Sequence, residues 1–154
     1  MGKIKRNRAY SLVEVALVLL IAGLMFGMIR PAYINMVDTG KSDSVVDKVK
    51  EIELKINDFY KDNGFYPDTL IEVYGEIPLD PWGNPYEYLR IDGGKFKGKG
   101  KLRKDKNLVP INSDYDLYSM GPDGKSVSPL TGNSSKDDIV RGRNGQFVGL
   151  ATDY

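Results

Sequence analysis

The sequence predicts an α+β protein in which one long N-terminal helix packs on a small antiparallel β-sheet head. The first observation is the run from Leu12 to Asn63, which is apolar and then amphipathic, as expected for a single helix of about fifty residues. The second is the change after Gly75, where proline and glycine interrupt every short apolar run and favour short strands and loops. The third is the length of 154 residues, which leaves about 120 for one modest head.

Composition excludes several classes of function. The chain carries 22 basic and 21 acidic residues, so its formal net charge of +1 lacks the basic excess typical of nucleic-acid-binding proteins. Cysteine and histidine are both absent, which excludes disulfides, thiolate or imidazole metal sites, and the catalytic triads built on these residues. Oxygen atoms are therefore the good metal ligands that remain, and they suit a hard cation such as calcium.

The N-terminal region predicts a membrane-crossing segment behind a basic leader. Residues 1–9 contain four cations and no acid, a composition that stays on the cytoplasmic side of a membrane. From Leu12 to Ile29 every residue except Glu14 is apolar or small, and this helical length spans about 27 Å, close to a hydrocarbon core of about 30 Å. A cleavable secretory signal is the alternative, but its apolar region is usually shorter, carries no acid, and ends in an Ala-x-Ala-like site. No such site follows Ile29.

This N-terminus resembles the prepilin signal of type IV pilins and pseudopilins, and the matching run is Arg-Ala-Tyr-Ser-Leu-Val-Glu at residues 8–14. The resemblance implies that a prepilin peptidase cuts between Ala9 and Tyr10 and that the new N-terminus of Tyr10 is methylated. The family mostly has Gly and Phe at these two positions. Pro31 falls at mature position 22, where the family tends to place a proline.

The resemblance also implies assembly roles for Tyr10, Glu14 and Pro31 in a helical filament of identical subunits. An ionised carboxylate at the bilayer centre costs about 2.5–3.5 kcal/mol, so Glu14 needs a partner. That partner would be the Tyr10 amino group of a neighbouring subunit; the alternative is a Glu14 that is hydrated at the membrane surface. Pro31 removes one helical hydrogen bond and bends or loosens the helix where it leaves the bilayer.

Beyond Pro31 the pattern predicts an amphipathic continuation of the helix. One face carries apolar residues at spacings of four, three, four and three, namely Val45, Val49, Ile52, Ile56 and Phe59. The opposite, solvated face is formed by Asp43, Asp47, Lys48, Lys50, Glu51, Glu53, Lys55 and Asp58. We expect the helix to end at Asn63-Gly64, because glycine caps helices and Pro67 prevents resumption.

In the head, residues 86–91 and 115–120 predict two strands, with a hairpin turn at residues 92–94. Residues 95–106 hold seven cations among twelve residues. This basic segment predicts a solvated loop, and an electrostatic contact with a partner is the alternative.

Three head segments resemble the major pseudopilin of type II secretion. These are the turn at residues 63–67, the Asp-Pro-Trp-Gly-Asn-Pro-Tyr loop within residues 77–88, and residues 114–124 followed by 137–139. Trp82 in the second segment is interpreted as a core residue; an exposed sugar or peptide site is the alternative. The chain departs from the family in the longer segment between Asp123 and Asp137, in lacking a tryptophan after Ile139, and in the tail through Tyr154.

The third segment implies a calcium-type C-terminal loop region. Its implied ligands are the backbone carbonyls of Met120 and Ser135 and the carboxylates of Asp123, Asp137 and Asp138. Three carboxylates brought together without a cation would repel one another, which is a physical reason to expect one. The alternative is an ordinary Asp-Gly turn followed by an Asp-Asp loop.

These interpretations divide the chain into a leader (1–9), a transmembrane half-helix (10–31), an amphipathic half-helix (32–64) and a β-rich periplasmic head (65–154). The implied function is that of a non-enzymatic, pilin-like structural subunit that polymerises into a periplasmic pseudopilus driving type II protein secretion. Its implied location is the bacterial inner membrane, and its implied partners are minor pseudopilins, the inner-membrane assembly platform and prepilin peptidase. The runner-up is a true type IV pilin for adhesion, motility or DNA uptake. A membrane-anchored calcium- or ligand-binding module that never assembles, and a small hydrolase, are the other classes.

Overall fold

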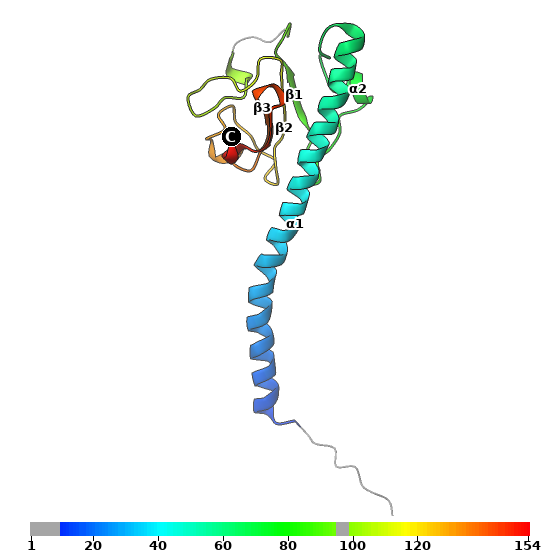
Figure 1. The fold of residues 1–154 in the computed structure, drawn as a ribbon. Helices are drawn as coiled ribbons and strands as arrows, with labels where there is room; N and C mark the ends of the chain where they lie inside the picture. Colours follow the sequence, from blue (N-terminus) through cyan, green and yellow to red (C-terminus); the bar gives the residue numbers. More distant parts are fainter. Residues whose placement is uncertain (1–9, 95–98) are drawn as a thin grey trace, which may run out of the picture. The chain divides into compact units, whose positions relative to one another are not determined.

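The computed structural model describes residues 10–94 and 99–154, and within its long helix the side chains of residues 27–38 lie outside this description. The chain forms two compact units, Met1–Thr39 and Gly40–Tyr154. The helix α1 (Leu12–Asn63) begins in the first unit and ends in the second (Figure 1).

Local signals account for both ends of α1. At its start, the Glu14 backbone N–H donates to Ser11 Oγ at 3.4 Å, so Ser11 acts as the N-cap, and Glu14 places a negative charge in the first turn. At its end, Gly64 has φ +77° and its N–H donates to the Tyr60 carbonyl at 2.8 Å. This left-handed conformation stops the helix where the Asn63-Gly64 pair indicates.

The head contains a four-stranded antiparallel sheet in which strand order follows the chain. The strands are β1 (Glu87–Arg90), β2 (Tyr115–Ser119), β3 (Ile139–Gly142) and β4 (Phe147–Leu150), and one short helix, α2 (Ile71–Tyr74), precedes them. The register pairs Tyr88 with Leu117, Tyr118 with Val140, and Val140 with Gly149. The α+β prediction, with an N-terminal helix and a small antiparallel sheet, is therefore confirmed.

The turn predicted after β1 forms, but it does not make a tight hairpin. Gly93 adopts φ +67° and the Gly94 N–H donates to the Ile91 carbonyl at 3.2 Å. The partner of this end of β1 lies more than twenty residues further along the chain, at Asp114, whose carbonyl accepts the N–H groups of Ile91 and Asp92 at 2.9 Å. The prediction was wrong here because the basic segment lies inside the β1–β2 connection.

The main core lies between α1 and one face of the sheet. Four of the five residues predicted for the apolar helix face are completely buried and Phe59 is half-buried; the buried four are Val45, Val49, Ile52 and Ile56. They form one cluster with residues of the sheet and its flanking loops, among them Tyr86, Tyr115, Leu117 and Ile139. Each such side chain contributes roughly 1.5–3 kcal/mol on burial, so this seam holds the head half of α1 in place.

A second core covers the other face of the sheet. Its buried residues are Ile111, Leu130, Val140 and Ala151, with Tyr118, Phe147 and Tyr154 packed around them. Ile139 and Val140 are adjacent in β3 and enter different clusters, as the alternation of side chains along a strand requires. The C-terminal tail, in which the chain departs from the family, thus supplies β4 and part of this core.

Candidate functional site

Of the residues predicted to act in assembly, Tyr10 lies just before α1, Glu14 lies in its first turn and Pro31 lies further along it. Tyr10 and Glu14 are both exposed, and the Tyr10 side chain retains 79% of its accessible surface. Pro31 lies within α1, with its side chain outside the described part. Ala9, the residue before the predicted cut, falls in residues 1–9 and is also outside the described residues.

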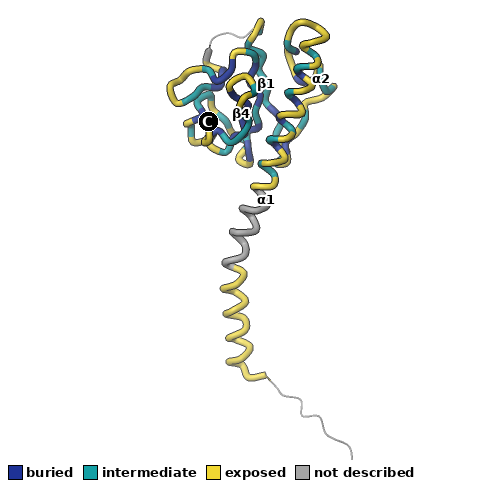
Figure 2. Tube along the Cα trace, in the orientation of Figure 1, coloured by how far each residue is buried: buried dark blue, intermediate teal, exposed yellow. Residues whose placement is uncertain are grey.

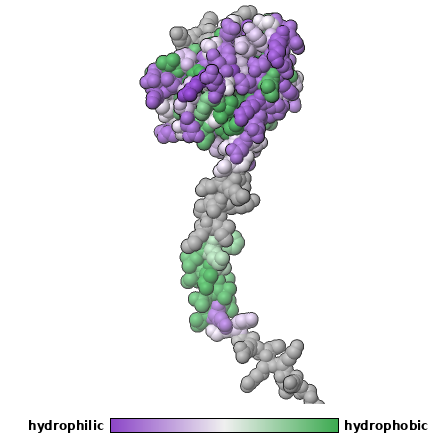
Figure 3. Space-filling view, in the orientation of Figure 1, coloured by the Kyte–Doolittle hydropathy of each residue, from purple (hydrophilic) through white to green (hydrophobic). Residues whose placement is uncertain are grey.

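The first unit exposes an apolar helix surface on all sides. Large side chains retaining between 48% and 88% of their accessible surface are Leu12, Val13, Val15, Leu17, Val18, Leu19, Leu20, Ile21, Leu24, Met25 and Phe26. Figure 2 shows this stretch as exposed, and Figure 3 shows it as a hydrophobic surface. An apolar surface of this extent indicates contact with lipid or with other protein.

Among the helices of the described residues, none meets the combined length and hydropathy expected of a membrane-crossing helix. The predicted segment 10–31 extends beyond residue 26 into residues whose burial lies outside the description.

The Asp-Pro-Trp-Gly-Asn-Pro loop is organised by the buried carboxylate of Asp80. Its Oδ1 accepts the N–H groups of Trp82 and Asn84 at 3.0 and 2.8 Å, and its Oδ2 accepts the Ser119 hydroxyl at 2.6 Å. The Asn84 side chain in turn donates to the Gly121 carbonyl at 2.8 Å. This loop therefore fastens the end of β2. Trp82 is half-buried and packs against the main core, in agreement with its interpretation as a core residue.

The loops predicted to hold calcium do approach one another. A Cβ on Gly121 would collide with the backbone oxygen of Asp137, and the Asp123 N–H donates to Asp137 Oδ2 at 3.2 Å. The Asp123 carboxylate is exposed and accepts the Lys125 N–H at 2.7 Å. Ser135 is buried, and its hydroxyl bonds both the N–H and the carbonyl of Val127.

Asp138 is directed to a different partner. It is completely buried, and its Oδ2 pairs with the Arg103 guanidinium and accepts the Ser126 hydroxyl at 2.6 Å. Burial raises the pKa of Asp138, while the Ser126 hydroxyl and the Arg103 charge act in the opposite direction. The side chain that sequence analysis treated as one ligand among five is therefore the acidic half of a buried ion pair.

As arranged, the predicted set does not fit a calcium ion bound through Asp138. Among the side chains that the structure describes, no group of three acidic residues is placed to hold a metal ion. The charge of Asp138 is already balanced by Arg103, and Asp123 and Asp137 accept backbone N–H groups. Asp138 Oδ1 is the exception, since it is buried and makes no hydrogen bond within the described residues.

Arg103 is the residue that sequence analysis missed, because it lies in the basic segment interpreted as a solvated loop. The described part of that segment contains Leu102 and Arg103, both buried, so the interpretation was wrong there. One signal was present: Leu102 is the only large apolar residue between Phe96 and Leu108. An isolated leucine in a charged run indicates that the chain turns inward at that point.

A second missed interaction ties α1 to the sheet. Arg141 is buried, pairs with Glu53 of α1 at 2.9 Å, and binds both carboxylate oxygens of Asp114 at 2.9 and 2.7 Å. Its guanidinium lies 4.0 Å from the centre of the Tyr115 ring. Glu53 was assigned to the solvated face of the helix, and this is incorrect because Arg141 draws it into a half-buried site.

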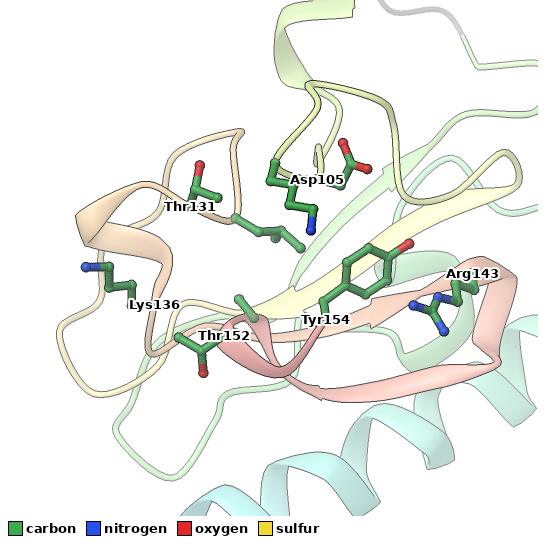
Figure 4. Close-up of a pocket in the computed structure, with 9 residues that line it drawn as sticks. Asp105, Thr131, Lys136, Arg143, Thr152 and Tyr154 are labelled. Atoms are coloured by element: carbon green, nitrogen blue, oxygen red, sulfur yellow. The ribbon is translucent and has the colours of Figure 1, made fainter.

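The tail also borders an open cavity of about 640 Å³ with cationic walls (Figure 4). In Figure 4 Tyr154 lies between Asp105 and Arg143, with Lys136 pointing away at the other end. Asp105 is the only carboxylate side chain among the lining residues. Hydrogen bonds from the Val109 and Asn107 N–H groups hold its pKa below the usual range.

Comparison with known proteins finds relatives that agree in name. The chain is 25% identical to type II secretion system core protein G of Pseudomonas aeruginosa over 79% of this chain and 87% of that protein. It is 26% identical to the protein of the same name from Klebsiella pneumoniae (88% and 94% covered) and 24% identical to that of Vibrio cholerae (86% and 92%). Seven proteins, all of this name, match the chain significantly. No family model matches the chain, and no solved structure matches it significantly.

Proposed function

Because the chain is a homologue of type II secretion system core protein G over most of its length, we propose that it is a pilin-like structural subunit of a periplasmic pseudopilus. The filament grows by addition of copies of this chain and helps to drive folded proteins out of the cell. The observation that carries the proposal is the exposed apolar start of α1, which contains a single acid, in a unit separate from the folded head.

In this proposal the exposed apolar residues are covered by different surroundings before and after assembly. Before assembly they are covered by lipid, so the first part of α1 anchors the subunit in the inner membrane with its head in the periplasm. After assembly they are covered by the corresponding helices of neighbouring subunits. The basic leader keeps the N-terminus cytoplasmic until prepilin peptidase cuts after Ala9 and methylates Tyr10.

Glu14 gives the assembled state its register. Its carboxylate lies in an apolar segment, and the amino group of a neighbouring Tyr10 becomes a cation only when the leader is removed. Pairing the two groups removes an uncompensated charge from a region of low dielectric constant, so the correctly staggered contact is favoured over others. The inner-membrane platform and minor pseudopilins are the further partners that this role requires.

The role is structural and requires no catalytic residue. The seven relatives all carry the name of a secretion-system core protein, and none carries the name of an enzyme, which agrees with the expectation that the chain is not an enzyme.

The test is deletion of the gene for this chain in its own bacterium. We expect secreted enzymes to accumulate in the periplasm, and the full chain supplied in trans to restore their release. The matched control replaces Met1–Thr39 with a cleavable secretory signal, which exports the head without the apolar helix. That version is expected to reach the periplasm folded and to leave secretion blocked. Normal secretion in the deletion strain, combined with loss of surface pili, would instead identify the chain as a type IV pilin.

A further inference from the structure

We propose that Arg103 occupies the role that a calcium ion would otherwise have at Asp138, so that the C-terminal loops of this chain are closed by an internal cation and need no metal. The inference concerns head stability and does not depend on the secretion role proposed above. It starts from the buried Arg103–Asp138 ion pair, whose side chains retain 3% and 0% of their accessible surface.

The backbone of Arg103 is held on both sides, so the guanidinium is brought to this place by the fold. Its N–H donates to Asp116 Oδ2 at 2.8 Å, and its carbonyl accepts the Ile111 N–H at 3.0 Å. The next residue, Lys104, bonds Ser128 and Leu130 through its N–H and carbonyl, both at 2.9 Å. The segment therefore threads between two loops and has little freedom to turn away.

The guanidinium connects three parts of the chain. Nη2 pairs with Asp138 Oδ2, and Nη1 donates to the Ser126 hydroxyl and to the Val127 carbonyl. The face of the guanidinium lies 4.3 Å from the centre of the Tyr118 ring in β2. A bound cation in a loop region joins separate segments by collecting their oxygens, and here an arginine collects a carboxylate, a hydroxyl and a carbonyl.

Charge balance then disfavours a metal at the same carboxylate. Asp138 and Arg103 neutralise each other in a site from which water is excluded. A divalent cation on the free Asp138 Oδ1 would lie close to the guanidinium and add two uncompensated charges at low dielectric constant.

The first experiment uses the full, unmodified chain in detergent micelles. Trp82 is the only tryptophan and packs on the head core, so its fluorescence reports unfolding of the head. We expect the melting temperature to agree within about 1 °C between millimolar calcium and excess chelator, since a ligand that does not bind cannot shift unfolding. A rise of several degrees with calcium that Asp138→Asn abolishes would overturn the inference.

The second experiment removes the internal cation. Arg103→Met leaves Asp138 buried and unpaired and is expected to lower the melting temperature by about 10 °C. The matched control is Lys101→Met, which removes an exposed cation two residues away and should change nothing. The double variant Arg103→Met with Asp138→Asn removes both charges and should recover more than half of the loss. The pairing role would be refuted if Arg103→Met had the same melting temperature as the wild type. It would also be refuted if the double variant recovered none of the lost melting temperature. If Arg103→Met does not fold, the comparison of calcium with chelator on the unmodified chain still tests whether the head needs a metal.

Discussion

Glu14 occupies a position with two physical explanations. It follows Ser11 by three residues in the first turn of α1, and its N–H bonds the Ser11 hydroxyl, so it completes the Ser-x-x-Glu pattern of a capping box. It is also the only acid in the apolar run of the first unit, where the proposed intersubunit pair with Tyr10 requires a charge. A glutamine at this position retains capping and loses the charge, which separates the two explanations.

We therefore expect Glu14→Gln and Glu14→Ala to fail equally in assembly. Both variants should insert in the membrane, because removing the acid lowers the insertion cost by up to about 2.5–3.5 kcal/mol. The measurement is cross-linking of neighbouring subunits in native membranes, compared with Ser11→Ala, which weakens the cap and retains the charge. If Glu14→Gln cross-links as well as the wild type, the intersubunit pair is not formed and capping explains the residue.

Arg141 is the residue on which the joint between α1 and the sheet most depends. Arg141→Met leaves Glu53 and Asp114 without their cation, and loss of one partner from a buried pair costs on the order of 3 kcal/mol. Urea unfolding followed by Trp82 fluorescence measures the loss. The control is Arg143→Met, an exposed arginine two residues away, which should change the free energy of unfolding by less than about 0.5 kcal/mol. Equal midpoints for the two variants would show that Arg141 acts only as a space-filling side chain.

At the scale of elements, the tail is a structural part of the head. Val140 of β3 lies opposite Gly149 of β4, and the Phe147 ring meets the Tyr154 ring edge-on at 5.3 Å. A Cβ on Gly142 would run into the Tyr154 ring, so this glycine leaves the space in which the aromatic ring packs. Without β4, β3 would become an open edge with unpaired backbone groups and an uncovered second core.

A graded loss of stability is expected along the tail. Tyr154→Ala removes one aromatic pair and part of the second core, at a cost of roughly 1–2 kcal/mol. Truncation before Phe147 removes β4 and should abolish cooperative unfolding of the head. Asp153→Ala, an exposed change in the same turn, is the control and should unfold as the wild type does. A truncated chain that still melts cooperatively would mean that β4 is an accessory strand. Circular dichroism against temperature distinguishes these results.

At the scale of the whole molecule, the two units meet different physical demands. The head buries two apolar cores, whereas the start of α1 retains much of its apolar surface in an isolated chain. The apolar helix surface is explained only by surroundings that a single subunit does not supply. Replacing Met1–Thr39 with a secretory signal removes the apolar unit and leaves both head cores intact. The exchanged protein is therefore expected to fold in its head and to fail in secretion.

The sequence alone determined what depends on near neighbours in the chain. The helix face from Val45 to Ile56 and the stop at Gly64 each follow from spacings of a few residues, because helical hydrogen bonds and side-chain rows repeat locally. The resemblance at the N-terminus and in the Asp-Pro-Trp-Gly-Asn-Pro loop was equally local, and the relatives found by comparison carry the name of the same secretion system.

Only the tertiary structure decided which charges are buried and with whom. Arg103 and Asp138 are 35 residues apart, and Arg141 and Glu53 are 88 apart, so no periodicity connects them. The strands β3 and β4 have four residues each, too short to stand out between glycines. A basic side chain in a charged run is solvated by default, and it becomes a structural cation only when the fold removes water from it and places a carboxylate within reach.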